Sequence, residues 1–453
     1  MPSRRDTLLY WSIFAAGCAI ALCVWSRSPG VPVDDEIAHL VIARNAWHYP
    51  ELILHIWGRV GNTLIYMIPA LFGLIGARLG ALLMSAATVL VTTATARQLG
   101  VRRLYLIPLF LWFQPWFPSY GFTAITEIPF LLIMALGMYG FVSKRYALLA
   151  LCIGWLPLIR HEGVLLTGIV FLYLLWKHQW RAALLAFAPL VVYNVVFELA
   201  LRMPLADSPL GVYFNSQPTT AYGSGPWLAY IPYLIWETGY PICFWALIGI
   251  YVVIRRRIRG TEYLLLYLSY LVIHSILYHF GLFGSGGYGF FILPLAPAGA
   301  LLAALGVEAL LELVSRAFPR APARARRSIP IIAATAILIP VLIMIQYVTP
   351  WKLDPTQSAV IEAVAWAQAR EIAPTAVIAP NIWFTFAYAY AYPWQPGDIW
   401  SACRDLNSAA AGTILIWDAH YASDCGYTPT PISPQWKEVA RFGYNQVVIL
   451  KKL

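Results

Sequence analysis

Three consecutive carboxylates, Asp34, Asp35 and Glu36, follow the first long apolar run of the chain, in a sequence of which only 11% is charged. A carboxylate partly removed from water has a raised pKa and can accept a proton from a hydroxyl group. Asp35 is therefore a candidate general base, with Asp34 as the alternative; Glu36, Glu127 or His279 could position the acceptor or a divalent ion. Helix capping is the competing explanation, but it uses only one carboxylate. Both roles can coexist, with Asp34 capping a helix and Asp35 free to react.

Other polar side chains could hold an anionic substrate. Arg160, in the stretch "LIRHEGVLL", could donate a fork of N–H groups to a phosphate, with Glu162 orienting it. Alternatively, Arg160 only anchors a helix end at the membrane interface. Further candidate binding residues are Glu127, His39, His279 and, in the glycine-rich "GSGGYG", Tyr288. His274 lies among aromatic residues and is expected to be a core residue.

The elements that must position these residues are apolar. Hydrophobic residues make up 60% of the chain, and apolar runs of about 15–25 residues recur from Leu8 to Tyr347. This pattern predicts a polytopic α-helical membrane protein. The net charge is +10, but the basic residues fall in short clusters between the apolar runs. Such clusters mark cytoplasmic loops that face anionic lipids, so no nucleic-acid partner is expected.

Placing each basic cluster in the cytoplasm predicts eleven membrane-spanning helices and a cytoplasmic N-terminus. The expected spans are 8–26, 79–96, 104–118, 127–143, 146–160, 164–177, 182–201, 230–254, 262–281, 290–313 and 329–347. The apolar segment 62–77 would invert every later cluster if it crossed, so we expect it to lie in, or dip into, the outer leaflet. Pro69 and Gly73 make it a poor straight helix.

The predicted extracytoplasmic loop 27–78 is unusually long. Within it, residues 34–48 have apolar positions at helical spacing on one face. We expect an amphipathic helix at the membrane interface, with its apolar face in the lipid and Trp47 and Tyr49 near the headgroups.

The composition changes after residue 348. Residues 1–348 are predicted to form the transmembrane module and residues 349–453 an extracytoplasmic α/β domain. The stretches "TAVIAPN", "GTILIWDAH" and "NQVVILKKL" favour short strands, and "SAVIEAVAWAQARE" favours an amphipathic helix. An oxidising compartment would permit a disulfide between Cys403 and Cys425; free thiols are the alternative. No metal-binding or nucleotide-binding motif is found, and a divalent cation is left open.

The order of these features resembles the GT-C superfamily of glycosyltransferases, which includes protein mannosyltransferases and the bacterial aminoarabinose transferases of lipid A. The resemblance covers roughly residues 1–312. It rests on Asp35-Glu36 opening the long first outer loop, an amphipathic helix, a half-inserted apolar segment, Glu127 at the fourth span, Arg160 after the fifth, and the late "GGYGFFILP".

The resemblance implies a glycosyltransferase of the cell envelope that uses a polyprenyl-phosphate sugar donor on the outer face, with the acid of the first loop essential. Asp35 matches that acid, and Asp34 is the alternative. The acceptor would be a hydroxyl of a lipid, glycan or protein, and an inverting reaction in a bacterial plasma (inner) membrane is expected. The Trp-Trp-Asp-Tyr-Gly signature of oligosaccharyltransferases is absent, so en bloc transfer to asparagine is not expected.

Two other classes of function compete with this interpretation. A transporter or flippase of a lipid-linked sugar would carry charges near the membrane midplane on broken, repeated helices. A non-catalytic envelope scaffold would leave the acidic cluster with only helix capping to perform.

Overall fold

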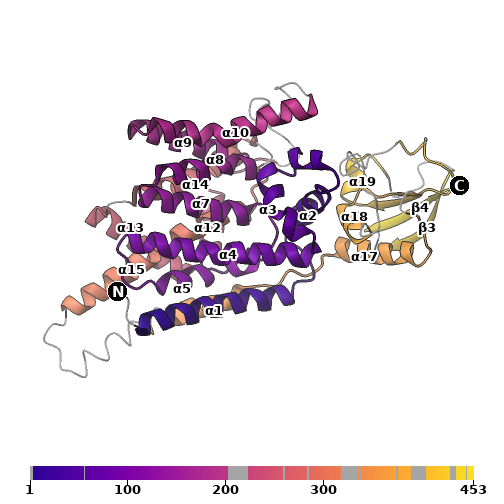
Figure 1. Ribbon diagram of the computed structural model, residues 1–453. Coiled ribbons are helices and arrows are strands. Elements are labelled where there is room, and N and C mark those ends of the chain that lie inside the picture. The colour runs from indigo at the N-terminus through magenta and orange to yellow at the C-terminus, as the bar shows by residue number, and fades with distance from the viewer. Residues whose placement is uncertain are drawn as a thin grey trace.

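The computed structural model is a helical bundle with a small sheet at one end (Figure 1). The N-terminus lies at the opposite end of the bundle from the sheet. The structure describes residues 4–55, 57–202, 223–258, 261–282, 285–317, 335, 338–373, 376–388, 405–428, 435–444 and 446–453. Residues 329–334, 336 and 337 of the predicted span 329–347 lie outside the described residues, as does Cys403; Leu338–Tyr347 is a short apolar helix.

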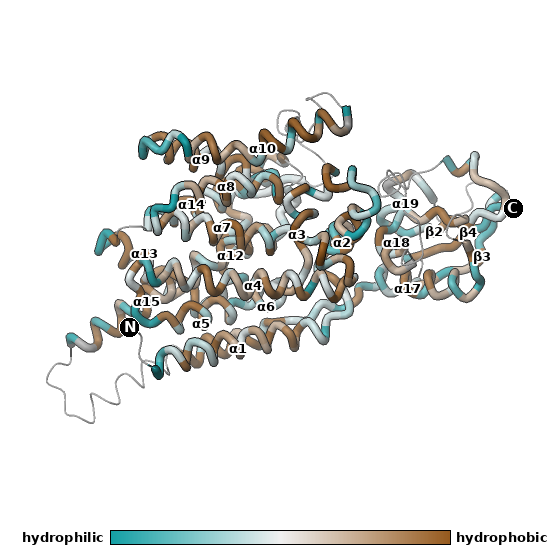
Figure 2. The backbone as a smooth tube through the Cα atoms, viewed as in Figure 1, coloured by the Kyte–Doolittle hydropathy of each residue, from teal (hydrophilic) through white to brown (hydrophobic). Residues whose placement is uncertain are grey.

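The bundle contains long helices and several short ones, with hydrophobic residues along their length and hydrophilic residues gathered towards their ends (Figure 2). Its α-helices are α1 (Arg4–Ser26), α2 (Asp35–Asn45), α3 (Val60–Ala70), α4 (Gly73–Gln98), α5 (Leu106–Trp112), α6 (Trp116–Tyr120), α7 (Glu127–Val142), α8 (Tyr146–Ile159), α9 (Gly163–Trp176), α10 (Trp180–Leu201), α12 (Tyr230–Thr238), α13 (Tyr240–Arg256), α14 (Leu264–His279) and α15 (Ala296–Ala317). Short 3₁₀ helices are η1 (Pro50–Leu54), η3 (Thr261–Tyr263), η5 (Gly289–Leu295) and η6 (Met344–Tyr347).

Fewer helices meet the length and hydropathy criteria for a membrane span than the eleven that the sequence predicts. In the described part of the chain, five helices are long and apolar enough to cross a membrane, or six if α12 and α13 count as one broken span. Helices α3, α7, α8 and α9 are apolar but only 11–16 residues long. The predicted count of eleven is therefore not confirmed.

Three predicted segments are broken in the structure near proline or glycine; the break in 62–77 was predicted, and those in the two spans 104–118 and 230–254 were not. The run 104–118 forms two helices, α5 and α6; Pro115 disfavours helical backbone at the residue before it. The run 230–254 bends by 105° at Gly239, whose φ of +82° suits glycine. The segment 62–77 is divided: α3 ends at Ala70, and residues from Gly73 onwards belong to α4.

Basic loops that the sequence places on one side of the membrane do meet in space. Glu312 on α15 lies 3.1 Å from Arg256, 3.7 Å from Arg316 and 3.9 Å from Arg102. These three arginines come from three different predicted cytoplasmic clusters. One end of the bundle therefore gathers positive charge, as the positive-inside pattern requires.

The C-terminal part contains a four-stranded sheet within its described residues. The strand order is β1-β2-β4-β3, from β1 (Val377–Ile378), β2 (Ile414–Asp418), β4 (Val447–Lys452) and β3 (Trp436–Phe442). The pair β1–β2 is parallel, and the pairs β2–β4 and β4–β3 are antiparallel. The accompanying helices are α17 (Pro355–Gln368), α18 (Ile382–Tyr388) and α19 (Tyr421–Asp424). β3 is a strand that the sequence analysis did not predict.

Helix α2 is enclosed by protein instead of lying with one face in lipid. Its apolar residues Ile37, Val41 and Ile42 pack in one hydrophobic cluster with α17, α18 and the sheet, while Leu40 packs into the bundle core. The predicted interfacial helix is therefore wrong in its environment. An apolar helix face shows that something covers it but does not distinguish lipid from protein. Consequently α2 joins the bundle to the sheet (Figure 1).

Candidate functional site

A buried ion-pair cluster lies where helices α7, α8 and α9 meet, with Arg160 at its centre. Arg160 follows the last residue of α8, and Glu162 precedes the first residue of α9. Arg160 Nη2 donates to Glu162 Oε1 at 2.9 Å, Nε donates to Oε2 at 3.4 Å, and Nη1 pairs with Glu127 at the start of α7. All three side chains are buried. The structure thus brings together three of the predicted site residues.

The opposite charges of Arg160 and Glu162 stabilise each other's ionised form. Burial raises the pKa of the Glu162 carboxyl, but Arg160, with smaller contributions from His274 and Arg59, holds that pKa below its usual value. Glu162 therefore remains a carboxylate at neutral pH. The face of the Phe291 ring lies 4.2 Å from the Arg160 Cζ, a cation–π contact. Because two of its nitrogens are directed at Glu162, the guanidinium has fewer free N–H groups than the predicted phosphate fork requires.

Asp35, the first residue of α2, lies within electrostatic reach of this cluster. It is half-buried, and within the described residues its carboxylate accepts no hydrogen bond. Burial raises the pKa of Asp35; Arg59 and Arg160 act in the opposite direction, and Asp34 adds to the increase. Asp35 is therefore a partly desolvated carboxylate that interacts with two arginines, the environment expected of a general base.

Arg59 is a site residue that the sequence analysis missed. It precedes α3 with φ +58° and ψ 102°, a strained conformation for a residue other than glycine. Its Nη1 donates to the Ile159 carbonyl at 3.4 Å, next to Arg160. Arg59 is one of four arginines in the loop 27–78, and nothing in the sequence distinguishes it from the others.

The histidines around Arg59 are neutral. Burial, together with the charges of Arg59 and Arg160, lowers the pKa of His39 well below its usual value. Burial and Arg59 lower the pKa of His161 to about 3. His39 Nδ1 is buried with no hydrogen-bond partner in the described part of the chain. His39 can therefore offer a ligand a hydrogen bond but no positive charge at neutral pH.

The structure separates the two histidines of α14. His279 Nδ1 lies 3.0 Å from the Gly225 carbonyl, and its ring stacks on Trp227 at 4.0 Å, so His279 holds the segment before α12. His274 is fully buried, has no hydrogen-bond partner among the described residues, and interacts electrostatically with Glu162. His274 is therefore a buried residue among aromatic rings, as the sequence predicts, and it also interacts with the Arg160 cluster, a role that the sequence analysis gave to His279.

Tyr288 lies at the edge of the cluster. It is 45% exposed, and its ring centroid lies 5.6 Å from that of Phe291, the ring that covers Arg160. Tyr288 therefore contacts the ring that packs on Arg160 but not Arg160 itself, and its exposed part is accessible to a substrate.

The two carboxylates next to Asp35 have other partners. Asp34 makes no side-chain capping bond, because its backbone is already helical (φ −64°, ψ −19°). The predicted capping role is therefore wrong. Its Oδ1 accepts from Trp383 Nε1 at 2.9 Å, and its Oδ2 accepts from the Tyr421 hydroxyl at 2.8 Å. Asp34 thus connects α2 to the C-terminal part.

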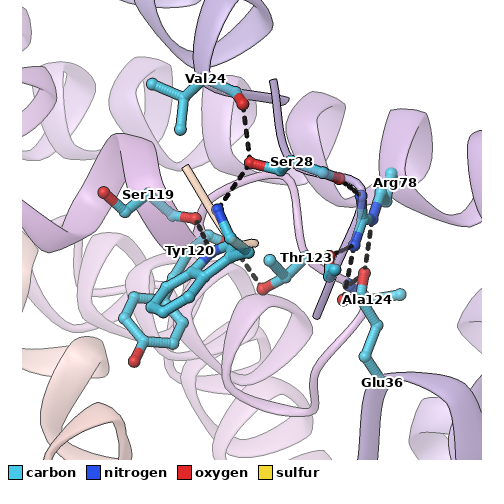
Figure 3. A network of polar contacts seen from close by, with 10 residues as sticks. Val24, Ser28, Glu36, Arg78, Ser119, Tyr120, Thr123 and Ala124 are labelled. Atoms are coloured by element: carbon cyan, nitrogen blue, oxygen red, sulfur yellow. Dashed lines mark hydrogen bonds and ion pairs between the residues drawn. The ribbon is translucent and has the colours of Figure 1, made fainter. Parts of the chain in front are cut away.

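Glu36 is fully buried and paired with Arg78 of α4 (Figure 3). Arg78 Nε donates to Glu36 Oε1 at 2.9 Å and Nη2 donates to Oε2 at 3.1 Å. The same guanidinium donates to the carbonyls of Ser28 and Gly30, and the Ala124 N–H donates to Glu36 at 3.0 Å. Glu36 is therefore a poor candidate base, and its network ties α2 to α4 and to the end of α1.

Removing the Arg78 charge should destabilise the bundle. In Arg78→Met, Glu36 becomes a buried, unpaired carboxylate, which we expect to lower the free energy of unfolding by about 3–5 kcal/mol. Denaturation in mixed micelles measures this. Arg102→Met is the matched control. The Arg102 side chain is 80% exposed and its ion pair with Glu312 is long, at 3.9 Å, so this pair contributes little to stability and little change is expected. Equal stability of the two variants would contradict a stabilising role for the Glu36–Arg78 pair.

The cysteines and the metal question follow from the described residues. Cys18, Cys23, Cys152 and Cys243 are free, and Cys425 is disulfide-bonded. The pairing with Cys403 stays a prediction, because Cys403 lies outside the described residues. Within those residues, no group of three His, Cys, Asp or Glu side chains could hold a metal ion.

Comparison with known proteins identifies the class of fold. No protein-family model and no curated protein sequence matches the chain. In three dimensions, however, the bundle with its C-terminal sheet has the GT-C glycosyltransferase fold.

Solved structures of two proteins illustrate this similarity. ArnT from Cupriavidus metallidurans bound to undecaprenyl phosphate matches with a TM-score of 0.67 and 14% identity, over 99% of this chain and 98% of that chain. Its apo form gives the same TM-score at 15% identity. The Archaeoglobus fulgidus oligosaccharyltransferase matches with a TM-score of 0.52 and 12% identity, over 81% of this chain and 58% of that chain. At these identities the similarity is one of fold.

Proposed function

We propose that this protein transfers a sugar from a polyprenyl-phosphate donor to an acceptor hydroxyl on the extracytoplasmic side of a bacterial plasma membrane. The observation that carries the proposal is the position of Asp35: a partly buried carboxylate, free of hydrogen bonds within the described residues, that interacts with Arg59 and Arg160. The fold supports the donor class, because the similar ArnT structure contains undecaprenyl phosphate.

Asp35 acts as the base. It takes the proton of the acceptor hydroxyl as that oxygen attacks the anomeric carbon of the donor sugar. The bond between the anomeric carbon and the phosphate oxygen breaks, and its electron pair leaves with the polyprenyl phosphate. Attack opposite the leaving group inverts the anomeric centre.

The arginines stabilise the leaving phosphate. Arg59 makes the direct contact, since the fork of Arg160 is directed at Glu162. Arg160 adds positive potential from a buried position, where charge interactions are stronger than in water. Glu127 and Glu162 hold Arg160 in place, and His39 and Tyr288 contact the sugar or the acceptor as uncharged partners.

A flippase for a lipid-linked sugar is the second candidate. The 105° break between α12 and α13 is the kind of helix interruption that transporters use near their binding sites. The cluster around Asp35 favours chemistry, because a carboxylate with a raised pKa beside two arginines is suited to proton transfer.

Reconstitution separates these candidates. Proteoliposomes containing the protein receive radiolabelled undecaprenyl-phosphate sugars on their outer face, together with a bacterial lipid extract. We expect a new glycosidic product and release of undecaprenyl phosphate in equal amounts. Labelled donor that crosses the bilayer without any new glycosidic bond would replace the transferase with the flippase.

A further inference from the structure

We propose that Asp34 is a positioning residue through which the C-terminal sheet holds helix α2, and with it Asp35, in register with the arginines. This inference rests on the proposed transferase function. Asp34 accepts two hydrogen bonds, from Trp383 Nε1 at 2.9 Å and from the Tyr421 hydroxyl at 2.8 Å. The donors lie 349 and 387 positions further along the chain, and each carboxylate oxygen takes one. Two bonds to two oxygens fix the rotation of the carboxylate as well as its position.

Both donors are held by the C-terminal part itself. The backbone N–H of Trp383 donates to Asn381 Oδ1 at 2.9 Å at the start of α18, and the indole ring of Trp383 is buried. Asp418, the last residue of β2, accepts from the backbone N–H of Tyr421 at 2.7 Å and from that of His420 at 2.9 Å. The Tyr421 hydroxyl is therefore aimed from the end of a sheet strand.

Packing reinforces this connection on the same side of α2. Ile37, Val41 and Ile42 lie in one hydrophobic cluster with Val360 of α17 and Ile416 of β2. Such packing sets the distance between helix and sheet, but apolar contacts allow small rotations and sliding. The hydrogen bonds of Asp34 are directional, so they select one rotation of α2 about its axis. That rotation decides where the neighbouring Asp35 carboxylate points.

Asp34 also sets part of the electrostatic environment of Asp35. The groups that act on Asp35 are Arg59 before α3, Arg160 after α8, Asp34 immediately before α2 and the Tyr421 hydroxyl from α19. The two arginines favour the ionised form of Asp35, whereas the charge of Asp34 disfavours it. Neutralising Asp34 should therefore move the acidic limb of the rate profile to lower pH, an effect that loss of packing would not produce.

The test combines activity, pH dependence and a readout independent of activity. Tyr421→Phe and the double variant Tyr421→Phe/Trp383→Phe keep the rings and remove the donors. We expect kcat to fall roughly 10-fold in the single variant and 10- to 100-fold in the double variant, with little change in the KM for the donor lipid. Hydrogen exchange of the α2 amides should become faster in both. In Asp34→Asn, the acidic limb of kcat/KM should move to lower pH.

Tyr444→Phe is the matched control, because Tyr444 is fully exposed in the same C-terminal part. We expect it to retain parental kcat and α2 exchange. Unchanged kcat and unchanged α2 exchange in the double variant, or an unmoved acidic limb in Asp34→Asn, would overturn the positioning role while leaving the transferase intact. Absence of sugar transfer by the parent protein would instead overturn the proposed function, and the exchange of α2 in the double variant would still decide whether Asp34 holds the helix.

Discussion

Asp35→Asn is expected to lower the rate of sugar transfer by about 10²–10⁴-fold, the usual contribution of a positioned general base. Asparagine keeps the shape of the side chain but cannot take the proton of the acceptor hydroxyl. Since within the described residues the Asp35 carboxylate accepts no hydrogen bond, its replacement should leave the fold and the binding of undecaprenyl phosphate nearly unchanged. The measurement is the initial rate of product formation at saturating donor, with unfolding and lipid binding followed in parallel.

The pH profile of the parent protein tests the same assignment. Because burial raises the pKa of Asp35, the rate should fall with decreasing pH at a value above the usual pKa of an aspartate, about 3.9. Asp35 must be ionised to act as the base, so activity is present above its pKa and lost below it. Glu51→Gln is a suitable control, since Glu51 is an exposed acid of the same loop. A rate in Asp35→Asn equal to that of Glu51→Gln would remove Asp35 from the mechanism.

The acidic cluster could be found in the sequence, but the different contacts of its three carboxylates could not. Asp34, Asp35 and Glu36 are neighbours in the chain, and each has a different environment. Glu36 pairs with Arg78, 42 positions away, whereas the partners of Asp34 lie more than 300 positions away. Hydrogen bonds between residues so distant leave no periodicity or spacing in the sequence. Local rules therefore assigned capping to Asp34, where the structure shows a tertiary contact.

The helices were predictable where hydropathy alone decides, and less so where the backbone breaks. Runs such as α1 and α10 closely follow the predicted spans. The breaks at Pro115 and Gly239 were not predicted, because a hydropathy pattern measures apolar character and does not register bends. Arg59 could not be singled out from the other arginines of the loop 27–78, because its contact with the Ile159 carbonyl joins residues 100 positions apart.

The position of α2 explains why the site requires two parts of the chain. One face of α2 packs against the bundle and another against the sheet, so the acidic residues at its start lie between the two. The bundle contributes Arg160 and Glu127, whereas the C-terminal part contributes contacts to Asp34. A base positioned in this way can face a lipid phosphate at the bundle and still be oriented from the aqueous side.

Removal of Arg160 should have the largest effect on the site. It can act in two ways, through the stability of the fold and through binding of the donor phosphate, and these must be measured separately. Arg160→Ala leaves Glu127 and Glu162 buried without their partner, and loss of one member of a buried ion pair costs about 3–5 kcal/mol of stability. If Arg160 also attracts the donor phosphate, the single variant should lose about 2 kcal/mol or more of binding free energy, roughly 30-fold in affinity. A loss of activity in Arg160→Ala alone would not distinguish these effects.

The triple variant Arg160→Met/Glu127→Gln/Glu162→Gln distinguishes them, because it removes the guanidinium together with both charges that depend on it. We expect its unfolding free energy to lie closer to the parent than that of Arg160→Ala, since replacing a buried charge network by uncharged groups is often neutral. Its affinity for undecaprenyl phosphate should nevertheless fall at least about 30-fold, as should that of Arg59→Gln in an otherwise intact cluster. If the triple variant binds the lipid as tightly as the parent while Arg59→Gln does not, Arg160 serves only to hold the ends of α7, α8 and α9 together, and the phosphate belongs to Arg59.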